Sequence, residues 1–175
     1  MQEIKIRHFT APDRNSNMLR DKFYWVYVNG KRLKFSSKKE LLAFLATVNR
    51  QLNDVAHAAN RLTAETYTEF RYYYFHLTHA DRSNCEQNFA ALNKMFNMLI
   101  SRSGGTNGNS FTFVRFNNIF EYLRSTIDIL HRNPMNRLAT VQRYRLKALK
   151  QSIDQLELQL NSVGENYQNE KFESY

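Results

Sequence analysis

A long periodic run of apolar residues constrains the fold of this chain more than any other feature. From Leu41 onward, apolar residues recur at alternating separations of four and three positions, as in a helix that packs along a roughly parallel neighbour. The run comprises Leu41, Leu45, Val48, Leu52, Val55, Ala59 and Leu62, and after a slip it resumes with Tyr67, Phe70, Tyr74 and Leu77. If Thr63 does not interrupt it, this helix has about forty residues and a length of about 60 Å, so we expect it to project or to be supported by a partner.

Further helices follow from local start and stop signals. Residues 37–40 and 83–86 each form a capping box, which predicts that helices begin at Ser37 and at Ser83. A third helix is expected to stop at Asn133-Pro134, and a fourth to run over about 135–163 and end at Gly164. Their apolar faces carry, in chain order, Phe89, Leu92, Phe96 and Leu99, then Phe116, Ile119, Phe120, Leu123, Ile127 and Leu130, then Leu146, Leu149, Ile153, Leu156, Leu160 and Val163. The sequence therefore predicts a mainly α protein, with about four helices in a bundle and one of them over-long.

A small N-terminal antiparallel β-element of two or three strands is expected before the bundle. EIKIRHF alternates apolar and charged residues, and FYWVYV and KRLKF flank Asn29-Gly30, the strongest short-range signal for a hairpin. In the second hairpin strand, Leu33 and Phe35 would share one face, with Arg32 and Lys34 on the other. The predicted organisation is a β-element at 1–36, a helical bundle at 37–163 and a polar, aromatic tail at 164–175.

Length and composition exclude several classes of protein. A chain of 175 residues with 42% apolar residues can bury one sizeable core. No apolar run is long enough to span a bilayer, and the N-terminal residues lack the apolar segment of a signal peptide, so we expect a soluble, unexported protein. The single cysteine, Cys85, cannot form an internal disulfide or a cysteine-based zinc site, and we interpret it as structural.

The net charge of +9 is unevenly distributed along the chain. Residues 1–39 carry +7 and residues 132–150 carry +6, the intervening segment is neutral, and residues 151–175 carry −4. Such a pattern suits a surface that faces nucleic acid, and it equally suits a subunit whose basic face meets an acidic partner. The candidate contacts are Lys31, Arg32, Lys34, Lys38, Lys39, Arg137, Arg143, Arg145, Lys147 and Lys150.

No residue set predicts catalysis, a metal site or a cofactor. The loop SGGTNGNS lacks the Lys-Ser/Thr ending of a phosphate-binding loop and follows a helix, so we interpret it as an interhelical loop. His76 and His79, with Asp81 nearby, match no helical metal-ligand spacing. The chain is therefore not expected to be an enzyme, and an unrecognised activity ranks third among its interpretations.

The aromatic run at 72–75 has two interpretations. Tyr72, Tyr73, Tyr74 and Phe75 could stack on bases, as aromatic side chains do in proteins that bind single strands. Four consecutive aromatics on a helix point in nearly all directions, however, so some belong to a core and the others suit a protein interface. We favour the interface.

One segment resembles a known DNA-binding module. FYWVYVNGKRLKFSSKKELLAFL, in the region 3–50, looks like the strand-hairpin-helix arm-binding module of tyrosine recombinases, in which basic strands enter a DNA groove. This resemblance implies DNA contacts for Lys31, Arg32 and Lys34. The rest of the chain is too short for the recombinase catalytic domain, and His79-Ala80-Asp81-Arg82 matches its His-x-x-Arg only by a common pattern. A recombinase is thus excluded, and the hypothesis that this resemblance leaves is a DNA-binding accessory protein that uses a basic β-hairpin.

The whole chain resembles, in architecture, the connector or adaptor ring proteins below the portal of short-tailed phages, including the crAss-like group. The matching features are the over-long helix, the four-helix pattern, the acidic aromatic tail and nineteen asparagines, a composition common in proteins of AT-rich genomes. The resemblance implies a ring-forming homo-oligomer located in the virion, otherwise in the cytoplasm, which contacts other virion proteins and double-stranded DNA without sequence specificity. No membrane or small-molecule substrate is expected. The intersubunit contacts that we predict are Tyr72, Tyr73, Tyr167, Phe172 and Tyr175.

Overall fold

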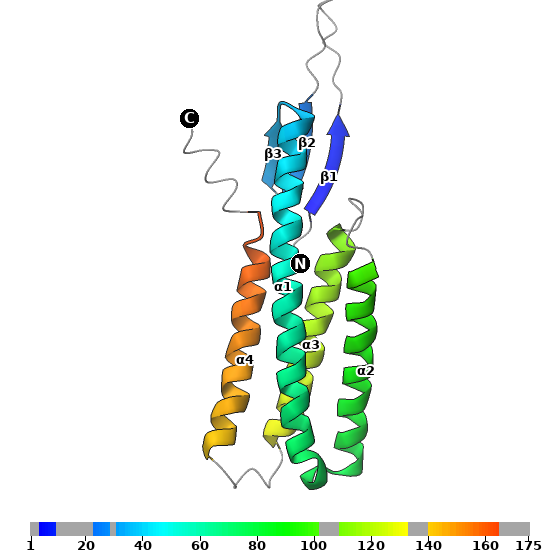
Figure 1. Ribbon diagram of the computed structural model, residues 1–175, viewed down its shortest axis with the longest axis vertical. Helices are drawn as coiled ribbons and strands as arrows, with labels where there is room; N and C mark the ends of the chain where they lie inside the picture. Colours follow the sequence, from blue (N-terminus) through cyan, green and yellow to red (C-terminus); the bar gives the residue numbers. More distant parts are fainter. Residues whose placement is uncertain (1–3, 10–22, 29–30, 102–108, 133–139, 165–175) are drawn as a thin grey trace, which may run out of the picture.

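The computed structural model describes residues 4–9, 23–28, 31–101, 109–132 and 140–164 (Figure 1). Within these ranges lie the strands β1 (Ile4–Phe9), β2 (Phe23–Val28) and β3 (Lys31–Phe35), the helices α1 (Lys38–Tyr73), α2 (His79–Ser101), α3 (Asn109–Arg132) and α4 (Thr140–Asn161), and the 3-10 turn η1 (Tyr74–His76). The molecule is elongated, with the sheet at one end and the helices packed side by side below it. The predicted class, mainly α with a small β-element and one over-long helix, is confirmed.

Helix α1 runs without a break through Thr63. It begins where the sequence predicts, because the backbone N–H of Glu40 donates to the Oγ of Ser37 over 3.2 Å and caps the first turn. The hydroxyl of Thr63 donates to the carbonyl oxygen of Ala59 at 2.8 Å, a bond that a threonine can make inside a helix. The predicted apolar run from Leu41 to Ala59 is buried and Leu62 is half-buried, so one face of α1 follows the core along its length.

Beyond Leu62 the buried face of α1 differs from the prediction. Thr66, Phe70 and Tyr73 are buried, whereas Tyr67 is 46% exposed and Tyr74 is half-buried. Although the apolar pattern in the sequence continues at Tyr67, the buried face of the helix continues through Thr66 instead. The polar Thr66 occupies an inner position instead, and its hydroxyl is satisfied by the carbonyl oxygen of Leu62 at 2.7 Å.

Helix α2 begins four residues before the predicted start at Ser83. The Oγ1 of Thr78 accepts a hydrogen bond from the backbone N–H of Asp81 at 3.1 Å, so Thr78 and not Ser83 caps the helix. Thr78 and Asp81 have the same spacing as the two ends of a capping box, and Asp81 places an acid in the first turn, where the helix dipole favours it. The predicted inward residues of α2 are buried or half-buried.

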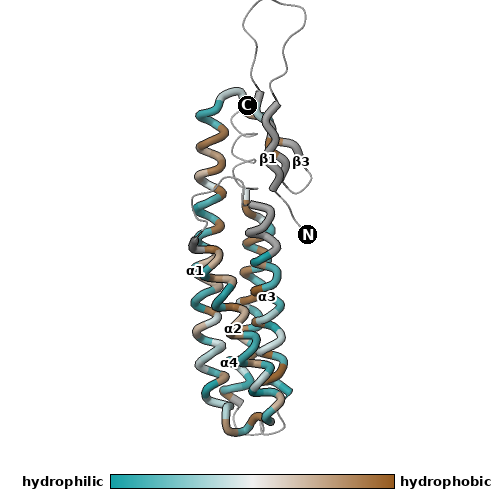
Figure 2. The backbone as a smooth tube through the Cα atoms, turned by 90° about the vertical axis from the view of Figure 1, so that its right-hand side faces the viewer, coloured by the Kyte–Doolittle hydropathy of each residue, from teal (hydrophilic) through white to brown (hydrophobic). Residues whose placement is uncertain are grey.

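Helices α3 and α4 bury every residue of their predicted apolar faces. α4 packs against both α1 and α3, and α3 packs against α2, which closes the bundle. Gly164 has a φ of 85°, a left-handed conformation that glycine adopts without strain, and it ends α4 as predicted. The predicted stop at Asn133-Pro134 and the predicted start of α4 at Met135 lie outside the described residues. In Figure 2 the helices carry alternating hydrophobic and hydrophilic bands, as expected for helices with one face in the core.

The sheet covers the first turns of α1. Its order is β1-β2-β3, both pairs are antiparallel, and Val28 pairs with Lys31, while the predicted turn residues Asn29-Gly30 lie outside the described residues. Leu33 and Phe35 are buried, and the rings of Phe35 and Phe44 lie 5.2 Å apart. The expectation that α1 projects is therefore corrected: the part of α1 that extends beyond α4 packs on the chain's own sheet (Figure 1). Support of α1 by a partner stays a prediction.

Candidate functional site

The predicted basic contacts lie in two separate places. Lys34, Lys38 and Lys39 are exposed around the junction of β3 and α1, at the sheet end of the molecule. The α4 group is exposed near the other end, because α4 begins at the end remote from the sheet (Figure 1); it comprises Arg143, Arg145, Lys147 and Lys150. The side chains of Lys31 and Arg32 and the whole of Arg137 lie outside the described residues. The cations of the two basic blocks whose side chains the structure describes are therefore not joined into one surface.

Two of the α4 cations bind carboxylates of the same chain. Arg145 lies 3.8 Å from Glu69 on α1, and Lys150 lies 3.7 Å from Asp128 on α3. Lys150 and Asp128 are both more than half exposed, so theirs is a surface ion pair that contributes little to stability. Arg145 is 63% exposed, but the side chain of its partner Glu69 is only 10% exposed. Both ion pairs reduce the charge that this part of α4 presents to a partner.

Glu69 is a buried carboxylate that the sequence analysis missed. The residue is 8% exposed, and its Oε2 has no hydrogen-bond partner among the described residues. Burial raises the pKa of Glu69 above its usual value, and the nearby Arg145 guanidinium only partly opposes this. A shallow pocket of about 330 Å³ between α1 and α4 borders it. The sequence contains a signal for this burial. Thr66 and Glu69 stand four and seven positions after Leu62, and this spacing places them on the inner face of α1.

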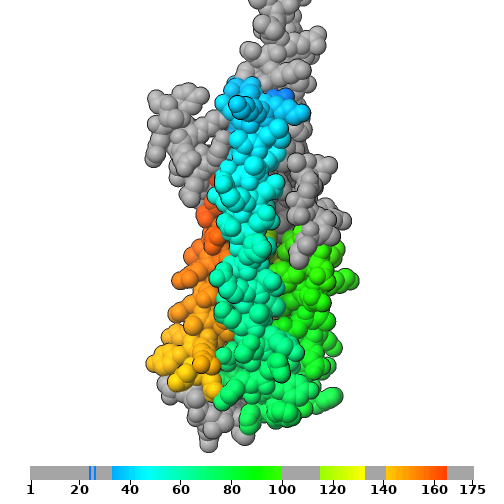
Figure 3. All heavy atoms as spheres, in the orientation of Figure 1, coloured from blue at the N-terminus to red at the C-terminus, as the bar shows by residue number. Residues whose placement is uncertain are grey.

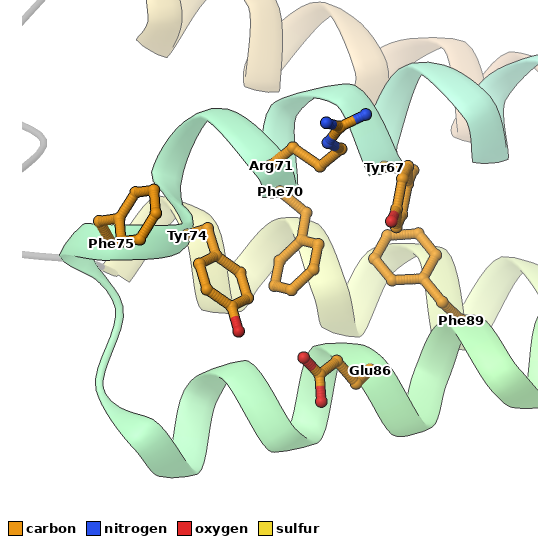
Figure 4. Close-up of a pocket in the computed structure, with 7 residues that line it drawn as sticks. All are labelled: Tyr67, Phe70, Arg71, Tyr74, Phe75, Glu86 and Phe89. Carbon is orange, nitrogen blue, oxygen red and sulfur yellow. The ribbon is translucent and has the colours of Figure 1, made fainter.

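An aromatic groove lies between the end of α1 and the start of α2. It has a volume of about 490 Å³, and we define it by its aromatic lining of Tyr67, Phe70, Tyr74, Phe75 and Phe89. In Figure 4, Phe70 of α1 and Tyr74 of η1 point toward α2, Glu86 lies along the side of α2 that faces them, and Arg71 points away from α2. The groove is thus apolar in its walls and carries one charge of each sign.

The walls of the aromatic groove are held by ring-to-ring contacts. Phe89 of α2 meets Tyr67 edge-on at a centroid distance of 5.1 Å and lies 5.5 Å from Phe70. Tyr74 packs edge-on against Phe70 at 5.6 Å, and the guanidinium of Arg82 lies 4.8 Å from the centre of the Tyr74 ring. Edge-on aromatic pairs and cation–π contacts of this kind restrict the rings. The groove is therefore a preformed surface.

The aromatic run at 72–75 is divided between the core and the surface. Phe75 is 83% exposed and Tyr72 is 59% exposed, so both are available to a partner. Tyr73 is only 4% exposed, and we correct its assignment as an intersubunit contact, because its side chain is part of the core. The other predicted contacts, Tyr167, Phe172 and Tyr175, lie outside the described residues.

Figure 3 shows that α1 runs along one face of the molecule between α4 and α2.

The residues considered for metal and thiol chemistry have separate environments. His76 and His79 are exposed, and no group of three or more metal-binding side chains occurs within the described part of the chain. Cys85 is buried, and burial raises the pKa of its thiol to about 11, which makes the thiolate rare at neutral pH. In the same described residues, no helix is long and apolar enough to cross a membrane.

Comparison of the chain with protein-family models, with curated proteins and with solved structures finds no match.

Proposed function

We propose that this chain is a structural assembly subunit that acts through protein–protein contacts. The observation that carries the proposal is the aromatic groove, a preformed apolar surface whose lining includes the strongly exposed side chain of Phe75. Tyr72, the other strongly exposed aromatic of the run at 72–75, adds a second candidate anchor near the end of α1. Exposed large aromatics that adjoin an apolar depression are the usual anchors of protein interfaces. Glu86 and Arg71 at the groove would contribute polar contacts around the apolar centre.

We further propose that the assembly is a ring of the head–tail connector class of short-tailed phages, located in the virion. This finer proposal is supported by the architectural resemblance, namely one over-long helix in a four-helix bundle that carries a small β-element. The basic side chains at the two ends of the molecule would then lie near DNA or acidic neighbours without reading sequence.

A mass measurement tests the assembly. Sedimentation equilibrium of the full chain, alone and with candidate portal and tail proteins, should give masses above the 20.8 kDa of one subunit, and electron microscopy should show rings. Changing both Tyr72 and Phe75 to serine should weaken association at least about tenfold, since truncation of interface anchors costs more than about 1 kcal/mol each.

Leu42→Ser is the matched control, because Leu42 is 49% exposed near the sheet end of α1, far from the aromatic groove. This variant should assemble like the unmodified chain. A subunit that stays monomeric both alone and beside candidate virion proteins contradicts the proposal.

A second candidate function is a DNA-binding accessory protein. The observation that favours it is the exposed group Lys34, Lys38 and Lys39, of which two stand in the first turn of α1. Cations at a helix N-terminus oppose the helix dipole, so Lys38 and Lys39 do not serve the stability of α1. Duplex affinity should fall steeply with salt, and changing all three lysines to alanine should reduce the slope of that dependence by about three. Unchanged affinity in the triple variant excludes this function.

A further inference from the structure

Helix α4 carries a second, exposed stripe with helical spacing. Its members recur at separations of three and four positions, and we call the set the outer stripe: Val141, Tyr144, Ala148, Gln151, Gln155 and Leu158. All six are exposed, and the three largest apolar members, Val141, Tyr144 and Leu158, are 61%, 66% and 68% exposed. None of them carries a charge. The spacing is that of a helix seam that meets another helix, although the opposite face of α4 already packs in the bundle.

The charges of α4 are separated along the helix. Residues 140–150 carry four cations and no acid, and residues 151–161 carry Asp154 and Glu157 and no cation. The first turn therefore lacks an acid and the last turn lacks a base, the reverse of the arrangement that stabilises a helix through its dipole. The stability of α4 itself thus does not explain this order of charges. Neighbouring helices of the same chain complement four of them: Glu69 binds Arg145, Asp128 binds Lys150, and Arg124 binds both Asp154 and Glu157. The order of charges along α4 is also complementary to that of an antiparallel copy of the same helix.

We infer that the outer stripe binds the outer stripe of a second copy of this chain, with the two α4 helices antiparallel. In the register that places Val141 beside Leu158 of the second copy, the apolar ends of the two stripes meet and the glutamines lie at the centre. The same register brings Lys147 beside Asp154 of the second copy, and the two-fold axis repeats this pair. A parallel arrangement would place the two cationic halves side by side, so charge selects the antiparallel one.

The contacts within each subunit are compatible with this pairing. Asp154 accepts a hydrogen bond from Arg124 of α3 at 2.9 Å, yet its side chain remains 57% exposed and can meet a second cation. Lys147 is exposed on the same flank of α4. The pairing uses α4 alone and leaves the aromatic groove between α1 and α2 accessible, so it does not depend on the proposed function.

The first test measures the mass of the full chain by sedimentation equilibrium at concentrations up to about 200 µM, where contacts of micromolar affinity are populated. Dimers are expected. Tyr144→Glu and Leu158→Glu should each weaken dimerisation at least about tenfold, because each would bury a charge in the contact. Leu42→Glu, an equally polar change on α1, should leave it unchanged, and circular dichroism should show all three variants folded. A strictly monomeric chain, or dimers unaffected by both α4 changes, overturns the inference.

The second test uses charge exchange to determine the orientation of the two helices. Lys147→Asp and Asp154→Lys each place like charges opposite one another in the antiparallel pair, so each variant alone should dimerise several-fold more weakly. An equimolar mixture should form heterodimers with the original affinity, because both pairs are then complementary. Glu157 still binds Arg124 in the Asp154→Lys variant, which preserves the contact between α3 and α4. If the mixture of the two variants dimerises no more tightly than each variant alone, the antiparallel pairing is wrong.

One variant separates the test of the α4 dimer from the test of the proposed assembly function. Serine at both Tyr72 and Phe75 should leave the α4 dimer intact while it weakens larger assemblies at least about tenfold. Loss of the dimer in that variant would place the self-contact at Tyr72 or Phe75 and would overturn the inference about α4.

Discussion

The backbone N–H of Gly164 donates a hydrogen bond to the Oε1 of Gln51 at 2.9 Å, which ties the end of α4 to the middle of α1. The contact joins residues 113 positions apart. In Figure 1, α4 ends partway along α1, and the part of α1 nearer its N-terminus lies beside the sheet.

Replacing Gly164 by alanine should destabilise the fold by about 1–2 kcal/mol, since a Cβ opposes the left-handed backbone observed at φ 85°. Denaturant unfolding measures this change. Gln159→Ala, at an exposed position in the same helix, is the control and should change stability by less than about 0.5 kcal/mol. Equal stabilities of the two variants would contradict the assigned role of Gly164.

Docking of the sheet on α1 depends on Phe44, which is fully buried against Phe35. Phe44→Ala should cost about 3–5 kcal/mol, whereas Leu42→Ala, two residues away and half-exposed, should cost less than about 1 kcal/mol. Thermal and denaturant unfolding of both variants provide the comparison. A small effect of Phe44→Ala would mean that the sheet does not cover this part of α1.

The burial of Glu69 predicts a pH-dependent stability. Because burial raises its pKa in the folded state, the folded chain holds this proton more tightly than the unfolded chain, and the contribution of Glu69 to stability falls as the pH rises above the ordinary value of 4.5. Glu69→Gln removes the charge and keeps the shape. The variant should therefore gain about 1 kcal/mol relative to the unmodified chain at pH 7 and little at pH 4.

Urea unfolding at several pH values measures the difference between the two proteins, and Glu65→Gln, exposed one turn earlier on α1, is the matched control. The difference in stability between Glu65→Gln and the unmodified chain should not increase from pH 4 to pH 7. If the curves for Glu69→Gln and the unmodified chain remain parallel from pH 4 to pH 7, the carboxylate is not desolvated.

Cys85 should react slowly with thiol reagents. With a pKa of about 11, only about one thiol in a thousand is ionised at pH 8, and burial adds a steric barrier. Alkylation of the folded chain should be at least about 100-fold slower than that of the chain unfolded in guanidinium chloride. Rapid labelling of the folded chain would show that α2 opens near Cys85.

Local periodicity was sufficient to predict which faces of α3 and α4 are buried and where α1 begins. Side chains three and four positions apart share a face of any helix, so the identity of the buried residues depends only on spacing. The capping interaction of Ser37 is similarly local, because donor and acceptor belong to the same helical turn. The same reasoning predicted that α2 begins at Ser83, whereas in the structure α2 begins four residues earlier and is capped by Thr78.

The sequence by itself thus determined the helices, the hairpin strands and most of the residues that they bury. Only the tertiary structure decided that the sheet covers the extension of α1, that Tyr73 and Glu69 are buried while Tyr72 and Phe75 are exposed, and that the described cations of the two basic blocks lie apart. The physical reason is that these outcomes depend on which segments, distant in sequence, pack against each side of a helix. Spacing along one helix defines its faces, but the neighbours that cover each face are set by the packing of the whole chain.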